Sequence, residues 1–296
     1  MKTAKFFVLT IVVLFAITPG ISTYAYTGHI AYVSDRDGQN EIYLMEMDGN
    51  NQIRLTDSTY DDICPVFSPN GQKIAFFSNR SGSYRIYTMD WNGTGIQEIS
   101  NSNCAVGTLA AGRGLAWSPD GQKVLFKPTN SSLATINLDG SGRFVIWDGA
   151  INGHDYIQGV EWGPTMDDIY VNAQVSGNGF NQHIFHYAVS TGVWTQITQD
   201  DVYPQHSQGP KISPNGLYIT FFKRISLEEK NIFTMNLDGS NGTQLTFDES
   251  PIINGCPSWV GDTGIVFDSD RSGGSRQIWI MDSTGANLQN VTRRRQ

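Results

Sequence analysis

The sequence predicts an all-β fold, a six-bladed β-propeller with mostly four-stranded antiparallel blades, and three observations indicate it. First, a glycine turn recurs along the chain at intervals of about 45 residues. Second, a Ser-Pro-x-Gly turn, or a degenerate form of it, keeps step with the first signal. Third, short apolar runs separate the turns, and no segment of adequate length has a helical period. The recurrent glycines are Gly49, Gly93, Gly140, Gly192, Gly239 and Gly285.

Each turn signal has a mechanical reason. In the motifs that begin at Ser68, Ser118 and Ser213, proline sets φ at the second position of a type I turn, and glycine takes the left-handed conformation at its end. Such a turn joins two antiparallel strands. The Asp-Gly, Asn-Gly or Thr-Gly dipeptide closes a later hairpin of the same unit, between its third and fourth strands. Each unit is therefore expected to hold four strands.

The strands themselves predict how the units pack. The run that follows each Ser-Pro turn is continuously apolar, as in the four residues from Ile74 to Phe77. A strand of this kind must be covered on both faces, which stacking between two neighbouring blades achieves. A fourth short strand ends in an apolar residue and a hydroxyl residue, as in Leu55-Thr56. The predicted blades cover residues 26–56, 63–100, 113–147, 158–198, 209–246 and 256–292.

The first unit lacks a recognisable inner strand. Inner strands are predicted near residues 63–67, 113–117, 158–162, 209–212 and 256–259. For the first blade we expect either that Ser22 to Thr27 supply the strand or that the blade has three strands. We expect no strand after Thr292 to close the ring.

Residues 1–25 have the pattern of a cleaved signal peptide. Lys2 and Lys5 form a positive start, an apolar stretch runs from Phe6 to Ile17, and small residues precede the boundary after Ala25. The apolar stretch is short for a membrane span, and no later stretch is apolar enough to be one. The sequence therefore predicts a soluble, exported protein, periplasmic or extracellular.

Charge and cysteine content exclude several classes. The formal net charge of −8 argues against nucleic acid as a partner, because such proteins need a positive surface. Three cysteines allow at most one internal disulfide, so a cystine framework is excluded. Cys64 and Cys256 occupy equivalent positions too far apart to bridge, whereas Cys104 lies on a loop that could reach Cys64. Free thiols are the other interpretation.

The segment from Cys64 to Phe76, with Ile42 to Met45 and Arg54 to Thr56 before it, resembles the WD-like repeat of TolB-type propellers. The resemblance covers essentially all of the chain after residue 25. It implies a non-catalytic scaffold that binds a protein or cell-envelope component, here as a monomeric propeller without the α/β domain that precedes the propeller in TolB. The same repeats precede a hydrolase domain in prolyl oligopeptidase-like enzymes, but no Gly-x-Ser-x-Gly nucleophile elbow occurs here.

The propeller topology predicts two faces. The Ser-Pro and Asp-Gly turns share one uniform face, and the blade-to-blade loops and middle hairpins share the other. Because specificity tends to lie in variable loops on a rigid scaffold, we expect the loop-rich face to bind the ligand or partner. Its candidate residues are Asp61, Asp62, Asp155, Tyr156, Tyr203, Asp248 and Glu249.

Two histidines on the loop-rich face, His154 and His206, are candidate ligands for a divalent cation at the channel mouth. The alternative function is thus a metal-dependent polysaccharide lyase or hydrolase, since some propeller lyases that resemble this repeat hold a metal with channel histidines and a glutamine. Gln205 or Gln208 could serve as that glutamine. An anionic substrate would be repelled by the acidic chain unless a metal intervened.

A third alternative is a glycan or small ligand bound in the central channel without turnover. Aromatic residues recur at the end of the inner strands and could stack on sugars, although regular recurrence favours a place in the core between blades. These residues are Phe67, Trp117, Trp162 and Trp259.

Overall fold

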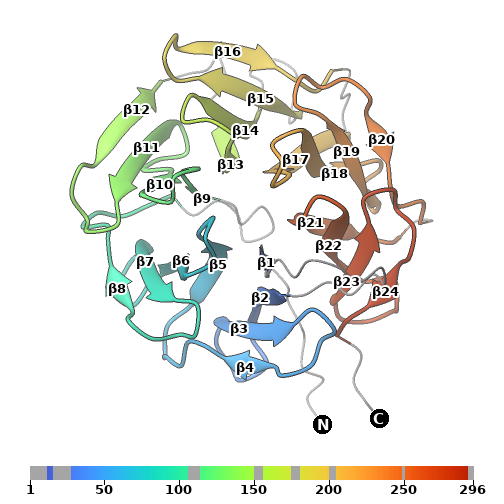
Figure 1. Ribbon diagram of the computed structural model, residues 1–296, viewed down its shortest axis with the longest axis horizontal. Coiled ribbons are helices and arrows are strands. Elements are labelled where there is room, and N and C mark those ends of the chain that lie inside the picture. Colours follow the sequence, from blue (N-terminus) through green and yellow to red (C-terminus); the bar gives the residue numbers. More distant parts are fainter. Residues whose placement is uncertain are drawn as a thin grey trace.

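The computed structural model describes residues 12–15, 28–105, 114–149, 156–174, 181–199, 205–248 and 251–292, the first of these ranges by its backbone alone. Six four-stranded antiparallel sheets stand around a central channel like the blades of a propeller (Figure 1). The predicted fold class is confirmed. Within the described ranges no helix is long and apolar enough to cross a membrane.

Strand order in the first three blades follows the chain from the channel outward. Blade 1 contains β1 (Val12–Phe15), β2 (Gly28–Ser34), β3 (Glu41–Glu46) and β4 (Ile53–Arg54). Blade 2 contains β5 (Asp62–Phe67), β6 (Lys73–Ser78), β7 (Arg85–Asp90) and β8 (Gln97–Glu98). Blade 3 contains β9 (Leu115–Trp117), β10 (Lys123–Phe126), β11 (Ser132–Asn137) and β12 (Phe144–Asp148).

The other three blades repeat this order. Blade 4 contains β13 (Tyr156–Trp162), β14 (Asp168–Gln174), β15 (Gln182–Ala188) and β16 (Val193–Gln196). Blade 5 contains β17 (His206–Ile212), β18 (Tyr218–Arg224), β19 (Lys230–Asn236) and β20 (Thr243–Gln244). Blade 6 contains β21 (Asn254–Val260), β22 (Gly264–Ser269), β23 (Gln277–Asp282) and β24 (Gln289–Asn290).

The innermost strand of blade 1 differs from both sequence-based alternatives. It is formed by Val12–Phe15, which lie in the predicted signal peptide, and it pairs antiparallel with β2. Blade 1 of the full chain is therefore four-stranded, and the three-stranded alternative is wrong for the full chain. Ser22 to Thr27 lie outside the described residues. The sequence did not predict this strand because its apolar residues fit the apolar stretch of a signal peptide equally well.

The apolar core is divided among the blade interfaces. In the described part of the chain, buried apolar side chains form six clusters, and each lies between two successive blades. In β2, Ile30 and Tyr32 pack toward blade 6, while Ala31 packs toward blade 2. Side chains alternate between the two faces of a strand, so one strand contributes to two clusters. This explains the continuous apolar runs.

Glycine turns bring successive blades into close contact. A Cβ atom on Gly49, whose φ is +83°, would overlap the carbonyl oxygen of Val291 in blade 6. This contact closes the ring between its first and last blades. Close approaches to the carbonyl of the preceding blade recur at Gly93 with Leu55, Gly140 with Ile99, Gly239 with Ile197 and Gly285 with Leu245. The repeated glycine thus serves packing between blades as well as the turn.

In five of the six blades, all but blade 3, a hydroxyl residue after the outer strand completes the blade edge. Thr56 Oγ1 accepts a hydrogen bond of 2.9 Å from the backbone N–H of Ile42 in β3. Ser100, Thr198, Thr246 and Thr292 accept the corresponding bonds from Ile86, Ile184, Ile232 and Ile278. A buried N–H that lacks a partner is costly, so these hydroxyls replace the strand pairing that ends there.

Inner strands carry a bulge where they bend along the channel. The register shifts between Ile63 and Val66 in β5, and comparable shifts occur in β13, β17 and β21. Cys64 and Cys256 have φ values of 56° and 47° at these bulges, and Gly209 has 62° at the same place in β17. None of the three cysteines forms a disulfide, so the pairing of Cys64 with Cys104 does not occur.

We predict that Gly49→Ala destabilises the protein by at least about 2 kcal/mol more than Gly82→Ala, because the new methyl group would push blade 1 away from Val291. Gly82 is the matched control, since its φ of +93° is similar and no atom lies within 4 Å of the added Cβ. Urea unfolding followed by tryptophan fluorescence measures both free energies. Equal losses in the two variants would contradict the role of Gly49 in closing the ring.

Candidate functional site

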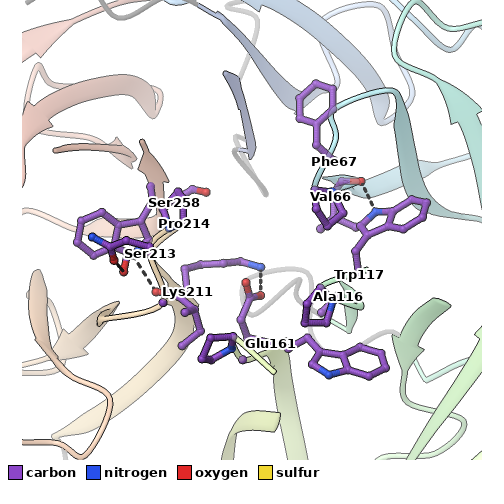
Figure 2. Close-up of a pocket in the computed structure, with 18 of the residues that line it drawn as sticks. Val66, Phe67, Ala116, Trp117, Glu161, Lys211, Ser213, Pro214 and Ser258 are labelled. Carbon is purple, nitrogen blue, oxygen red and sulfur yellow. Dashed lines mark hydrogen bonds and ion pairs between the residues drawn. The ribbon is translucent and has the colours of Figure 1, made fainter. Parts of the chain in front are cut away.

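A cavity lies at the channel mouth on the Ser-Pro-turn face. Its volume is about 760 Å³, and its walls are the ends of the inner strands and the Ser-Pro turns of blades 2 to 6 (Figure 2). Strand order places these five strand ends around one axis. The cavity is therefore a product of the ring and belongs to no single blade.

An ion pair spans two blades inside this cavity. Lys211 of β17 donates through Nζ to the Glu161 carboxylate of β13, and Figure 2 shows both side chains pointing into the channel. The two side chains are only 9% and 16% exposed. Removing one partner of such a pair leaves a buried charge, which is strongly unfavourable. The pair thus gives the cavity a fixed dipole, and Asp262 is the third charged residue of its lining.

Aromatic side chains form much of the apolar part of the wall. Trp117 and Trp259 are 7% and 5% exposed. Their indole Nε1–H groups donate to the carbonyl oxygens of Val66 and Lys211 on the preceding blades, at 2.9 Å in each case. This confirms that these aromatics belong to the core between blades. Because they also line the cavity, they present a firm apolar surface to a ligand.

The Ser-Pro turns form a rigid rim. Ser68 Oγ accepts from the N–H of Lys73 at 3.0 Å, and the Gly71 N–H donates to the Ser68 carbonyl at 2.8 Å. The Asn-Gly turn of the same blade lies beside this turn, since the Trp91 N–H donates to the Gln72 carbonyl at 3.0 Å. The two kinds of turn therefore share one face, as the topology predicts.

Two acidic candidates of the loop-rich face are engaged by their own fold. Asp62 is fully buried and forms an ion pair of 2.9 Å with Arg80 of the middle hairpin in blade 2. Asp61 accepts hydrogen bonds from the backbone and side chain of Asn40, at 3.2 and 2.9 Å. Both carboxylates thus connect an inter-blade loop to a middle hairpin.

Asp248 has a comparable role between blades 5 and 6. Its carboxylate accepts from Arg271 at 2.7 Å and from the amide of Asn254 at 2.9 Å. Arg271 also donates to the Ser269 hydroxyl at 3.1 Å, and its guanidinium lies 5.0 Å from the ring centre of Trp279. Turn chemistry and packing therefore explain the sequence Asp-Arg-Ser-Gly at residues 270–273 of this middle hairpin.

The remaining candidates of the loop-rich face are only partly described. His206 begins β17 and is 6% exposed. Tyr156 begins β13, and Lys127 Nζ lies 5.9 Å from the centre of its ring. His154, Asp155, Tyr203 and Glu249 lie outside the described residues. Within the described part of the chain, no three His, Cys, Asp or Glu side chains gather as a metal site.

Between blades 4 and 5, four amide side chains form a network. Gln208 donates to Gln158 at 3.3 Å and also to Gln182, and Asn172 donates to Gln182 at 3.3 Å. The Gly209 N–H donates to Asn172 Oδ1 at 3.3 Å, at the bulge of β17. Gln208 was a candidate metal ligand, and here it belongs to this network.

Lys127 is a charged group within the loop-rich side of blade 3. It has no exposed surface, and its Nζ donates to the carbonyl of Ile157 at 2.7 Å. Burial lowers the pKa of Lys127 to about 8, because the apolar surroundings disfavour the ammonium form. The group therefore titrates near the working pH of most assays.

Sequence reasoning missed Glu161 and Lys211. Both stand three positions before the proline of a Ser-Pro-type turn, where blades 2 and 3 have Val66 and Ala116. Opposite charges at an otherwise apolar repeat position are the signal that could have indicated a pair in the channel. The preference for variable loops directed attention to the other face.

Comparison with known proteins agrees with this architecture. Residues 22–139 match the model of the TolB beta propeller domain. A 49-residue segment is 49% identical to the Tol-Pal system protein TolB of Geobacter sulfurreducens, and it covers 17% of this chain and 11% of that protein. The chain thus matches only a small part of the length of this curated relative.

Solved structures extend the likeness to nearly the whole ring. TolB from Acinetobacter baumannii superposes with a TM-score of 0.71 and 19% identity, over 90% of this chain and 63% of that one. Oligogalacturonate lyase from Vibrio parahaemolyticus superposes with a TM-score of 0.57 and 12% identity, over 97% and 74% of the two chains. At these identities the structures show a shared fold. Together with the domain match, they show that this chain forms a propeller similar to that of TolB.

We predict that raising the pH from 7.5 to 9.5 increases the free energy of unfolding of the wild type by about 2 kcal/mol more than that of the Lys127→Met variant. Burial lowers the pKa of Lys127 from 10.5 to about 8 in the folded state. Between these values the unfolded chain holds a proton that the folded chain lacks, so stability rises with pH; below about 8 both states are protonated. Urea unfolding of both proteins at the two pH values measures this change. An equal difference in unfolding free energy between the two proteins at pH 7.5 and at pH 9.5 would contradict the prediction.

Proposed function

We propose that this TolB-like propeller is an exported, non-catalytic scaffold that binds a protein of the cell envelope. The observation that carries the proposal is the channel mouth on the Ser-Pro-turn face, where a buried ion pair between Glu161 and Lys211 lies in a rigid cavity with both apolar and polar walls. A pocket with an apolar wall and a few fixed polar groups is typical of a binding site.

The chemistry of the cavity favours binding over turnover. The Glu161 carboxylate is held by Lys211 on the neighbouring blade. Its position is thus fixed by a partner on the adjacent blade. An arrangement of this kind suits recognition of a polar group on a protein side chain or backbone, oriented by the dipole of the pair.

Of the two faces, the Ser-Pro-turn face has the stronger support as the partner surface. On the loop-rich face, Asp62 and Asp248 are engaged by Arg80 and Arg271. These carboxylates stabilise the fold, so they are less available to a partner. The relative in Geobacter sulfurreducens is named a Tol-Pal system protein, which supports an envelope protein as the class of partner.

Export is part of the proposal. Lys2 and Lys5, the apolar stretch after them and the small residues before the boundary at Ala25 support a cleaved leader. The scaffold would then work as a monomer in the periplasm or outside the cell. N-terminal sequencing of the exported protein tests this, and Tyr26 is the expected first residue.

The metal-dependent lyase remains the rival function. Its support is the shared fold with oligogalacturonate lyase and the candidate ligands His154 and His206. A transition metal bound in stoichiometric amount to the wild type, and lost in His206→Ala, would favour the lyase over the scaffold. Glycan binding in the channel would appear as saturable binding of an oligosaccharide without cleavage.

The scaffold is tested by exchanging the two charges of the channel pair. We predict that the double variant Glu161→Lys with Lys211→Glu folds like the wild type, because an ion pair is kept. Its affinity for the envelope partner should be at least about tenfold lower, because the dipole of the pair is reversed. Partners are recovered by affinity purification from envelope extracts, identified by mass spectrometry, and their affinities are measured with purified protein.

Lys73→Glu is the matched control. Lys73 follows the Ser-Pro turn of blade 2 and forms an exposed pair of 2.9 Å with Asp90 outside the cavity. This variant changes charge on the same face and should retain the partner. Equal partner binding by the wild type and the charge-exchanged variant would show that the channel pair has only a structural role.

A further inference from the structure

The inner strand of blade 1 comes from a segment that the exported protein is expected to lose. In the full chain, Val12–Phe15 form β1, and the register pairs Val12 with Ala31 and Leu14 with His29 of β2. Figure 1 shows β1 at the channel between β5 and β21, in the place that an inner strand occupies in each other blade. Cleavage after Ala25 would remove this strand from blade 1.

The hydrogen-bonding pattern identifies which groups of β2 would become free. Ile42 of β3 uses its backbone N–H and C=O on the outer side, bonding Thr56 Oγ1 at 2.9 Å and the Leu55 N–H at 2.8 Å. In an antiparallel pair the direction alternates along the strand, so Tyr43 faces β2 and its partner Tyr32 faces β3.

Alternation then continues along β2 itself. Ile30, Tyr32 and Ser34 direct their backbone groups toward β3, and His29, Ala31 and Val33 direct theirs toward the inner edge. The inner edge therefore presents a row of donors and acceptors to the channel once β1 is gone. An open edge of this kind is a template for pairing with another chain.

We propose that this inner edge of β2 in the exported protein binds an extended apolar segment of the envelope partner, which becomes the fourth strand of blade 1. The inference rests on the proposed function and specifies the mode of binding. The strand would lie in the slot between β5 and β21, antiparallel to β2, as β1 does in the full chain. Main-chain bonds supply affinity in this mode, and side-chain pockets supply specificity.

The chemistry of the occupant follows from the strand already seated there. Val12–Phe15 read Val-Val-Leu-Phe, an apolar and largely β-branched or aromatic sequence that favours extended structure. An apolar segment also suits the neighbourhood, because the buried residues of β2 are mainly apolar. Its placement within a ring of inner strands favours a single strand over a helix or a bulky loop.

The slot and the channel cavity have two blades in common as walls. The cavity walls include Val66 and Phe67 from blade 2 and Ser258 and Trp259 from blade 6, which are the two blades beside blade 1. A partner segment that enters at the Ser-Pro-turn face would pass the Glu161–Lys211 pair and then reach the edge of β2. One bound segment can thus use both features.

Hydrogen exchange of the mature chain, residues 26–296, tests the open edge. The probe is a synthetic peptide of residues 9–16 of this chain, flanked by lysines for solubility. Without the peptide, the amides of His29 and Ala31 should exchange quickly, and saturating peptide should slow them by about a hundredfold or more. The amides of Ile30 and Tyr32, which face β3, are internal controls and should be protected throughout.

Two methylated peptides provide a matched pair. N-methylation at Leu14 blocks a donor that pairs with β2, whereas N-methylation at Val13 blocks one that points away. The first change should weaken binding by about tenfold, and the second should have little effect. Equal weakening by both would overturn the proposed strand pairing.

Variants of the protein connect the slot to the partner. His29→Pro removes an inner-edge donor while leaving the bonds from Ile30 to β3, and His29→Ala is the control that keeps the N–H. Circular dichroism and thermal melting establish that both are folded. The partner should bind His29→Pro about tenfold more weakly than His29→Ala. If the partner binds both equally and still depends on the Glu161–Lys211 pair, the strand proposal is wrong while the scaffold function stands.

Other results would also overturn the proposal. Protection of His29 and Ala31 in the mature chain alone would show that the slot is already filled, and a dimer in light scattering would identify a second copy as the occupant. Exported protein that still carries residues 12–15 would show that the slot is never vacated. If the peptide slows exchange at His29 and Ala31 but no envelope partner binds the wild type, the proposed scaffold function is wrong.

Discussion

The structure depends on the stacking of each blade between two others. The middle strands are apolar on both faces, so one blade alone would expose the apolar side chains of both faces. Ile30 and Tyr32 need blade 6, and Ala31 needs blade 2. Stability is therefore a property of the closed ring, and the contact between the first and last blades is as important as the contact between any other two neighbouring blades. The approach of Gly49 to Val291 makes that contact at the backbone level.

Ring closure has a direct consequence for the channel. Because every blade adds its inner strand to the same axis, side chains from blades far apart in sequence meet there. Glu161 and Lys211 are such a case, since each alone would be a buried charge and only the adjacent blade provides its partner. The indole of Trp259 depends in the same way on a carbonyl of blade 5. The binding surface and the packing of the ring thus use the same residues.

The two faces of the ring solve different physical problems. On the loop-rich face, arginines of the middle hairpins hold carboxylates of the inter-blade loops, as Arg80 holds Asp62. On the other face, serine and proline shorten the turns, and the inner strands end around an open cavity. Paired carboxylates on one side and a hollow on the other thus distinguish the two faces of the ring in the described part of the chain.

The sequence alone determined the fold class, because the spacing of turn residues and the doubly covered apolar strands are local features that each blade repeats. It also determined that Trp117 and Trp259 belong to the core, since regular recurrence implies a regular environment. Tertiary structure decided which charges matter. Asp62 and Asp248 stand out in the sequence but are paired within the fold, and Glu161 and Lys211 become a site only where blades 4 and 5 meet. Local patterns specify strands and turns, whereas a pair formed across a ring depends on distances that no local pattern contains.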